Sequence, residues 1–262
     1  MTTPAYNRQA ALAAEGVTVR YRRAGRPPVL ALDGVSLDVR RGEMVGLIGE
    51  SGSGKSTLAK TLLGMMRPDS GRVLSDGRDI ARFGASENRA FRRSVQMVFQ
   101  DAVGSLNPRF TVGATLREAL AVHRACAKGE MDSRIAELLE QVGLPAEVAG
   151  HTPRELSGGQ CQRVSIARAL AVNPRVLIAD EPVSALDVSV QARILNLLAD
   201  LRDRLGLGVL LIAHDLAVVG AVCDRVNVLW GGRIIEAGLP GDVLHRPTHP
   251  KVRELLAAVP RI

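Results

Sequence analysis

The sequence reads Gly49-Glu50-Ser51-Gly52-Ser53-Gly54-Lys55-Ser56-Thr57 directly after an uncharged run from Met44 to Ile48. This stretch fits the phosphate-binding pattern G-x-x-x-x-G-K-[ST]. The preceding run is typical of a buried parallel strand, and Lys55 to Met66 have the apolar spacing of a helix. A glycine-rich turn between a strand and a helix can surround a polyphosphate with backbone N–H groups. The sequence therefore predicts a site for a nucleoside triphosphate.

Two side chains of this stretch have predicted roles at the phosphates. We expect Lys55 to reach the β- and γ-phosphates and the Ser56 hydroxyl to ligate Mg²⁺. The glycines let the backbone approach phosphate oxygens without a Cβ in the way. The alternative is a glycine-rich turn with an incidental lysine, and the flanking strand and helix argue against it.

Length and composition are those of a globular α/β protein. The chain has 262 residues, 46% of them hydrophobic and 23% charged, which allows one large domain with an inserted subdomain. No apolar run approaches the roughly 20 residues that cross a bilayer, and the first nine residues lack the apolar core of a signal peptide. We therefore expect a cytoplasmic location. Three widely spaced cysteines, Cys126, Cys161 and Cys223, predict reduced thiols and no zinc site.

The formal charge of +7 permits either a nucleic-acid partner or a position near an anionic membrane face. Aromatic residues make up only 3% of the chain, so stacking platforms for bases are hard to build. A solvated basic face remains the simpler interpretation of the arginine clusters. We expect no nucleic-acid partner.

The order of patterns along the chain predicts two kinds of sheet and a helical insert. Runs at 16–21, 28–32 and 35–39, and a hairpin around Asp76-Gly77, indicate an N-terminal antiparallel sheet. Helical spacing follows through 111–144, and strands return at 175–179, 208–213 and 225–230, with a helix over 188–205. Alternating strands and helices predict a parallel core. We expect one domain over 1–262, with a helical insert near 101–172 and a short tail at 238–262.

Two further motifs follow the phosphate-binding stretch. Leu156-Ser157-Gly158-Gly159-Gln160 precedes an apolar helix, where Ser157 suits the N-cap and the glycines leave N–H groups open to an anion. The apolar strand Val176 to Ala179 ends in two carboxylates. Asp180 can hold Mg²⁺ directly or through water, and Glu181 is placed to orient and deprotonate an attacking water.

Together these motifs resemble the nucleotide-binding subunit of an ABC transporter over nearly the whole chain. The resemblance implies an ATPase of the ABC-type P-loop fold, with ATP and Mg²⁺ as cofactors. It implies that Ser157, Gly158, Gly159 and Gln160 contact the γ-phosphate held by the other protomer. It assigns Gln100 to the link between nucleotide, Mg²⁺ and the membrane subunits, and Asp187, in Ser184-Ala185-Leu186-Asp187, to a dimer contact. His214 would contact the γ-phosphate, and Tyr21 would stack on adenine.

A narrower resemblance concerns the branch of the family. The segments that look like the peptide and nickel importers are Arg92 to Gln100, Ser105 to Arg109, Pro182 to Gln191, and His249-Pro250 ahead of Leu255-Leu256. That branch implies two membrane-spanning subunits, a sister ATPase or a second copy of this chain, and an extracytoplasmic solute-binding protein. It also implies a peripheral place on the cytoplasmic face of the cell membrane. Ala102-Val103-Gly104 and the end at Ile262 are closer to nickel or metal-chelate ATPases, so both cargoes stay open.

The resemblance implies that ATP closes a dimer, that Glu181 assists attack by water, and that hydrolysis reopens it. Two alternatives remain: an exporter ATPase, and an ABC-type ATPase acting on nucleic acid or ribosomes. His245 and His249 are four residues apart, but Pro247 and Pro250 oppose a regular helix between them. We therefore expect no metal site there.

Overall fold

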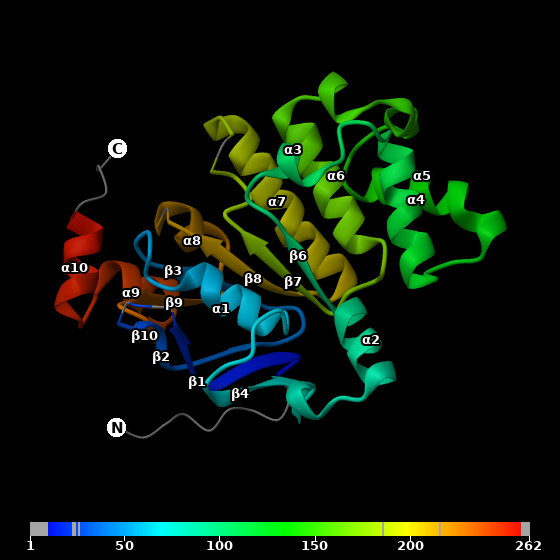
Figure 1. The fold of residues 1–262 in the computed structure, drawn as a ribbon. Helices are drawn as coiled ribbons and strands as arrows, with labels where there is room; N and C mark the ends of the chain where they lie inside the picture. Colours follow the sequence, from blue (N-terminus) through cyan, green and yellow to red (C-terminus); the bar gives the residue numbers. More distant parts are fainter. Residues whose placement is uncertain (1–9, 23–24, 26, 185, 215, 258–262) are drawn as a thin grey trace.

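The centre of the fold is a six-stranded, mostly parallel sheet in the order β10-β9-β3-β8-β7-β6 (Figure 1). The computed structural model describes residues 10–22, 25, 27–184, 186–214 and 216–257. The strands are β3 (Met44–Ile48), β6 (Val95–Val98), β7 (Val176–Asp180), β8 (Gly208–Ala213), β9 (Arg225–Trp230) and β10 (Arg233–Gly238). All pair in parallel except β10, which runs antiparallel to β9. The parallel strands therefore share one C-terminal edge and one N-terminal edge.

A second, antiparallel sheet has the order β2-β1-β4-β5. It consists of β1 (Leu12–Tyr21), β2 (Val29–Val39), β4 (Ser70–Ser75) and β5 (Arg78–Asp79). The hairpin predicted at Asp76-Gly77 is confirmed between β4 and β5. The two runs predicted at 28–32 and 35–39 are wrong as separate strands. They form the single strand β2, because Gly34 adopts a φ of 65° and the pairing with β1 shifts register nearby without breaking.

Helix α1 (Lys55–Leu62) lies between the two sheets (Figure 1). Its Leu58, Ala59 and Leu62 are fully buried and join a core cluster with residues of both sheets. The predicted helix to Met66 is too long, since Gly64 takes a φ of 67° and ends the helical path. Burial of α1 on two sides therefore positions the residues at its N-terminus.

A helical region gathers on the side of the parallel sheet away from the antiparallel one (Figure 1). It contains α3 (Ala102–Ser105), α4 (Val112–His123), α5 (Met131–Gln141) and α6 (Gly158–Leu170), with short 3₁₀ turns at Lys128–Glu130, Ala146–Gly150 and Pro153–Glu155. Helices α7 (Val188–Leu205) and α8 (Leu216–Val222) complete this layer. Alternate residues of the central strands, such as Leu177 and Ile178, face the two different cores.

Several elements were not predicted from sequence. They are β6, β10, α2 (Ala85–Ser94), the 3₁₀ turn Ile80–Arg82, α8, α9 (Pro240–His245) and α10 (Pro250–Ala257). Glu236 on β10 accepts hydrogen bonds from Thr248 N and Oγ1 and from His249 N, and so fixes the segment between α9 and α10.

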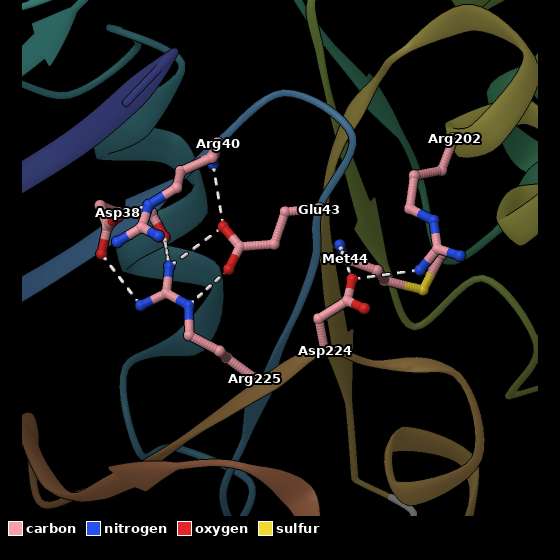
Figure 2. A network of polar contacts seen from close by, with 7 residues as sticks. All are labelled: Asp38, Arg40, Glu43, Met44, Arg202, Asp224 and Arg225. Atoms are coloured by element: carbon pink, nitrogen blue, oxygen red, sulfur yellow. Dashed lines mark hydrogen bonds and ion pairs between the residues drawn. The ribbon is translucent and has the colours of Figure 1, made fainter. Parts of the chain in front are cut away.

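A network of charges ties together the N-terminal edge of the parallel sheet (Figure 2). The Arg225 guanidinium donates to Glu43 at 2.5 and 3.2 Å and to the Asp38 carboxylate and carbonyl at 3.1 and 3.0 Å. Burial alone would lower the Arg225 pKa, but the bonds to Glu43 and Asp38 raise it above its ordinary value. Beside it, Asp224 accepts from Met44 N at 2.7 Å and from Arg202 at 3.1 Å. The network links β2, β3, β9 and α7.

None of the helices in the described ranges is long and apolar enough to cross a membrane. The three cysteines are free thiols, as predicted, and Cys161 and Cys223 are buried.

Candidate nucleotide site

Three neighbouring strands deliver the predicted site residues to the C-terminal edge of the parallel sheet. Strand β3 leads into the loop 49–54, β7 ends at Asp180 and is followed by Glu181, and β8 is followed by His214. Strands β7 and β3 both pair with β8, so the three ends lie side by side. Topology thus brings together residues that are more than 150 positions apart in the sequence.

The loop 49–54 is shaped by glycines and by the lysine that follows it. A Cβ on Gly49 would lie 2.2 Å from the Leu229 carbonyl oxygen, and Gly54 adopts a φ of 111°. Lys55 Nζ donates to the carbonyls of Gly49 at 2.7 Å and of Glu50 at 2.9 Å. The lysine therefore lies folded over its own loop, with its charged end where the backbone turns.

Burial lowers the pKa of Lys55, and the nearby carboxylates of Glu181 and Asp180 oppose that shift. Burial also raises the pKa of Asp180, with the negative charge of Glu181 acting in the same direction and Lys55 and Lys60 against it. The two shifts indicate a charge cluster partly removed from water. Such a cluster is typical of a functional site.

Tyr21 lies at the start of α1, because its hydroxyl is 3.1 Å from Thr57 Oγ1. Tyr21 is 38% exposed, so part of the residue is accessible to a ligand. Ser56 and the segment Glu50–Gly52 are also exposed, whereas Ser53 is buried. The predicted base and phosphate contacts thus lie on neighbouring surfaces of β1 and α1.

Glu181 is the centre of a polar cluster. Gln100 Nε2 donates to Glu181 Oε2 at 2.8 Å, and His214 Nδ1 lies 3.7 Å from the same oxygen. Glu181 has a φ of 44°, a left-handed conformation that non-glycine residues adopt at a cost in free energy and that is often found at functional sites. The structure therefore groups Glu181, Gln100 and His214, the three residues predicted to act at the γ-phosphate and Mg²⁺.

The segment 157–160 begins α6 on the helical region. Ser157 caps the helix as predicted: its Oγ accepts from Gln160 N at 3.3 Å, and Gln160 Oε1 accepts from Ser157 N at 2.9 Å. No hydrogen bond or ion pair joins 157–160 to the loop 49–57 within the described residues.

The glycines of α6 also pack within their own chain. A Cβ on Gly159 would lie 2.6 Å from Val190 Cγ1, and one on Gly158 would lie 3.3 Å from Leu186 Cδ2. Sequence reasoning assigned both glycines only to anion binding. Close packing against the start of α7 is a second reason for glycine at these positions.

Asp187 caps α7, since its Oδ1 accepts from Ser189 Oγ at 2.7 Å and from Val190 N at 2.9 Å. The bond from Ser189, followed by that from Val190, lowers the pKa of Asp187. Asp187 is exposed, so its carboxylate is accessible for the predicted dimer contact. Ala185, part of the same predicted motif, lies outside the described residues.

Two side chains with central contacts were missed from sequence. Ser184 Oγ donates to the Glu181 carbonyl at 3.2 Å and is 3.4 Å from Gln100 Nε2. Gln191 donates to the carbonyls of Val183 and Leu186 at 3.1 and 2.9 Å. A glutamine in the first turn of a helix, four residues after its cap, was the available signal.

No group of three or more His, Cys, Asp or Glu within the described parts of the chain could hold a metal ion, including around His245 and His249.

A parallel sheet with a glycine-rich loop, lysine and paired acids at its C-terminal edge defines a P-loop NTPase. The chain belongs to the ABC transporter family, whose pattern it matches over residues 32–184. The protein is therefore an ABC-type ATPase, and the predicted family, fold class and ATP-hydrolysing activity are confirmed.

Relatives in two Brucella species support the predicted branch of the family. A protein of Brucella ovis named as a peptide import ATP-binding protein is 51% identical over 229 residues, which are 87% of this chain and 72% of the relative. A similarly named protein of Brucella abortus is 51% identical over 238 residues, covering 90% of this chain and 71% of the relative.

Solved structures of ABC ATPases have the same fold. A dimeric post-hydrolysis state of the ATP-binding cassette MJ0796 bound to ADP and Pi superimposes with a TM-score of 0.78 at 33% identity, covering 87% of this chain and 98% of that one. The structure of cbiO1 from Clostridium perfringens, part of the ABC transporter complex cbiONQ, gives a TM-score of 0.80 at 30% identity over 97% of both chains.

Proposed function

We propose that this chain is an ATPase subunit of a peptide importer and that ATP is hydrolysed at the C-terminal edge of its parallel sheet. The contact between Gln100 and Glu181, beside Lys55 and Asp180, is the observation that carries the assignment of the site. The names of the relatives favour peptides over nickel or metal chelates. They also favour import over export.

Each residue of the site has a role that fits its position. Backbone N–H groups of 49–57 and the ammonium of Lys55 bind the phosphates, and Tyr21 stacks on adenine. Glu181 orients the attacking water and accepts its proton, while Gln100 donates to one Glu181 carboxylate oxygen and His214 lies near the same oxygen. His214 also contacts the γ-phosphate. Positioning and charge neutralisation supply most of the catalysis.

The donor set also fits Mg²⁺. The Ser56 hydroxyl and the Asp180 carboxylate would hold the ion, with the Gln100 amide oxygen near it, and hard oxygen donors are those that Mg²⁺ prefers. When bound, the ion neutralises negative charge on the β- and γ-phosphates. The burial that raises the pKa of Asp180 shows a carboxylate poorly solvated by water, as a cation-binding carboxylate is.

Two ATPase chains form the active unit in this proposal. Ser157 to Gln160 of one protomer complete the nucleotide site of the other, and Asp187 lies at the contact between them. The partner is a second copy or a sister ATPase. The MJ0796 cassette, which is dimeric, supports this arrangement.

A groove of about 950 Å³ between the end of α1, β6, α4 and α6 is the proposed contact with two membrane-spanning subunits. Apolar side chains are exposed in it, with Met65 at 69%, Phe99 at 43% and Val122 at 71%. Phe99, which lines the groove, directly precedes Gln100. Dimer closure that displaces Gln100 would therefore also move the groove. In this arrangement the chain is peripheral on the cytoplasmic face of the membrane. A solute-binding protein acts outside the cell, and no nucleic acid takes part.

Glu181→Gln tests the assignment of the site. The amide cannot accept the proton of water, but it leaves Lys55, Ser56 and Asp180 in place, so ATP should bind and hydrolysis should fall about 1,000-fold. ATP affinity measured by calorimetry and phosphate release measured in the assembled complex check both parts. Glu140→Gln, on the exposed face of α5, is the matched control. Turnover near the wild-type rate in Glu181→Gln would refute the assignment.

The cargo and partners require a separate experiment. The chain should be purified with its complex from native membranes, and the co-purifying proteins and the ligand held by the solute-binding protein should be identified. We expect two membrane-spanning subunits and a bound peptide. A nickel chelate as the ligand, or a complex that moves its cargo outward, would refute the proposed cargo or direction.

A further inference from the structure

The segment from Glu181 to Asp187 joins two parts of the site within one chain. At its start, Ser184 Oγ donates to the Glu181 carbonyl and lies within reach of Gln100. Near its end, Leu186 lies against Gly158 of α6, and Val190, just beyond the segment in α7, lies against Gly159. A displacement of this segment would therefore act on both the carboxylate and the glycines.

Gln191 is the side chain that holds the segment in place. One amide nitrogen, Nε2, donates to the Val183 carbonyl at 3.1 Å and to the Leu186 carbonyl at 2.9 Å. Its backbone N–H donates to the Asp187 carbonyl at 2.8 Å. The half-buried amide thus satisfies two carbonyls of the turn before α7, which would otherwise lack these partners.

Two backbone hydrogen bonds also join described residues of this turn. Leu186 N donates to the Val183 carbonyl at 3.1 Å, and Ser184 N donates to the Glu181 carbonyl at 3.3 Å. Both are short-range bonds within the turn, whereas Gln191 connects the turn to an 18-residue helix. The Gln191 amide therefore ties the orientation of the turn to α7.

We propose that Gln191 is a positioning residue that fixes the turn 183–186, and thereby keeps Glu181 and the two glycines of α6 in a set relation within each chain. Because the glycines serve the site of the other protomer, Gln191 connects the two ATP sites of the dimer. This inference rests on the proposed function of Glu181 and of residues 157–160.

Gln191→Met and Gln191→Glu test the role in the complete membrane complex. Methionine keeps the length and helix propensity of glutamine but removes both donated bonds, and glutamate places a negative charge against two carbonyls. We expect kcat to fall about tenfold in Gln191→Met and further in Gln191→Glu, with the KM for ATP unchanged within about twofold. Asn196→Leu, which removes an exposed amide of the same helix, should leave both constants unchanged.

The outcomes separate the two proposals. If Glu181→Gln abolishes hydrolysis while Gln191→Met keeps the wild-type kcat, the role of Gln191 is refuted and the proposed function stands. If Glu181→Gln hydrolyses ATP normally, the proposed function fails whatever Gln191 does. A rise in KM equal to the fall in kcat would also overturn the positioning role, since it would indicate a direct contribution to nucleotide binding. If either Gln191 variant fails to assemble, the kcat and KM of the other variant decide the role of Gln191.

Discussion

Asp180, which we propose as a ligand of Mg²⁺, is a partly buried carboxylate at the end of β7. Its pKa is raised from 3.8 by burial and by the charge of Glu181, so its ionised form is less favourable in the folded chain than in water. A group with a raised pKa contributes stability below its unfolded pKa and loses that contribution as the pH rises through its folded pKa. At neutral pH the Asp180 carboxylate therefore destabilises the protein without nucleotide.

We predict that Asp180→Asn raises the Tm of the nucleotide-free chain at pH 8 by about 2 °C or more, with a smaller difference near pH 4. Scanning calorimetry at the two pH values measures the effect. Asp200→Asn, exposed on α7, is the control. A lower Tm for Asp180→Asn at pH 8 would contradict the direction of the shift. Hydrolysis of ATP should nevertheless be lost, because the neutral amide is a weak ligand for Mg²⁺.

At the scale of elements, the contact between α6 and α7 places a steric limit on the start of α6. Gly159 faces Val190, whose branched side chain has little freedom to rotate away. Alanine is a better helix former than glycine by about 1 kcal/mol, so any loss of stability on adding a methyl group there must come from packing.

We predict that Gly159→Ala lowers the free energy of unfolding by about 1–2 kcal/mol and kcat about tenfold, and that Val190→Ala in the same chain restores most of both. A double-mutant cycle on denaturant unfolding and ATPase rate measures the coupling. Additive effects would show that the two residues act independently. The cycle also distinguishes packing within the chain from damage to the site of the partner, which Val190→Ala cannot repair.

How far sequence reasoning succeeded also differs between elements. Helix α7 was predicted with the bounds that the structure shows, because Asp187 caps it and Gly206 ends it. Strands β8 and β9 were predicted equally well, since β8 is a continuous apolar run and β9 has four apolar residues around Arg225 and Asn227. Strand β6 has only four residues, including Gln96, and β10 is an edge strand with one charged residue in its middle, so neither has the pattern of a buried strand.

The site was predictable only as far as local motifs extend. The loop 49–57 and the pair Asp180-Glu181 each come at the end of an apolar strand. This position identified them as candidate site residues. The bonds of Gln191 to Val183 and Leu186, and the contact of Gly159 with Val190, depend on how a turn and two helices meet in space. No pattern along the chain encodes these distances.

At the scale of the whole molecule, Arg225 connects the antiparallel sheet to the parallel one. Its partners Asp38 and Glu43 are only 8% and 13% exposed, so without the guanidinium two partly buried carboxylates would keep only their contacts with Arg40 (Figure 2). The network is therefore expected to matter more than the surface ion pairs of this chain.

We predict that Arg225→Leu lowers the free energy of unfolding by about 3 kcal/mol and leaves the ATP affinity of the folded protein within about twofold of wild type. Denaturant unfolding followed by the fluorescence of Trp230, the only tryptophan, measures stability. Arg233→Leu removes an exposed pair with Asp33 and should cost less than about 1 kcal/mol. Equal losses in the two variants would show that burial of the Arg225 network has no special effect.

The charge network and the nucleotide loop lie at opposite ends of β3. Five residues at about 3.3 Å each separate them by roughly 16 Å, with only fully buried side chains between. Substitutions in the Arg225 network are therefore expected to change stability with little effect on ATP turnover. Adaptation to a warmer habitat could therefore proceed through substitutions in the Arg225 network that raise stability while the transport rate stays the same. Protein engineers could use the same substitutions.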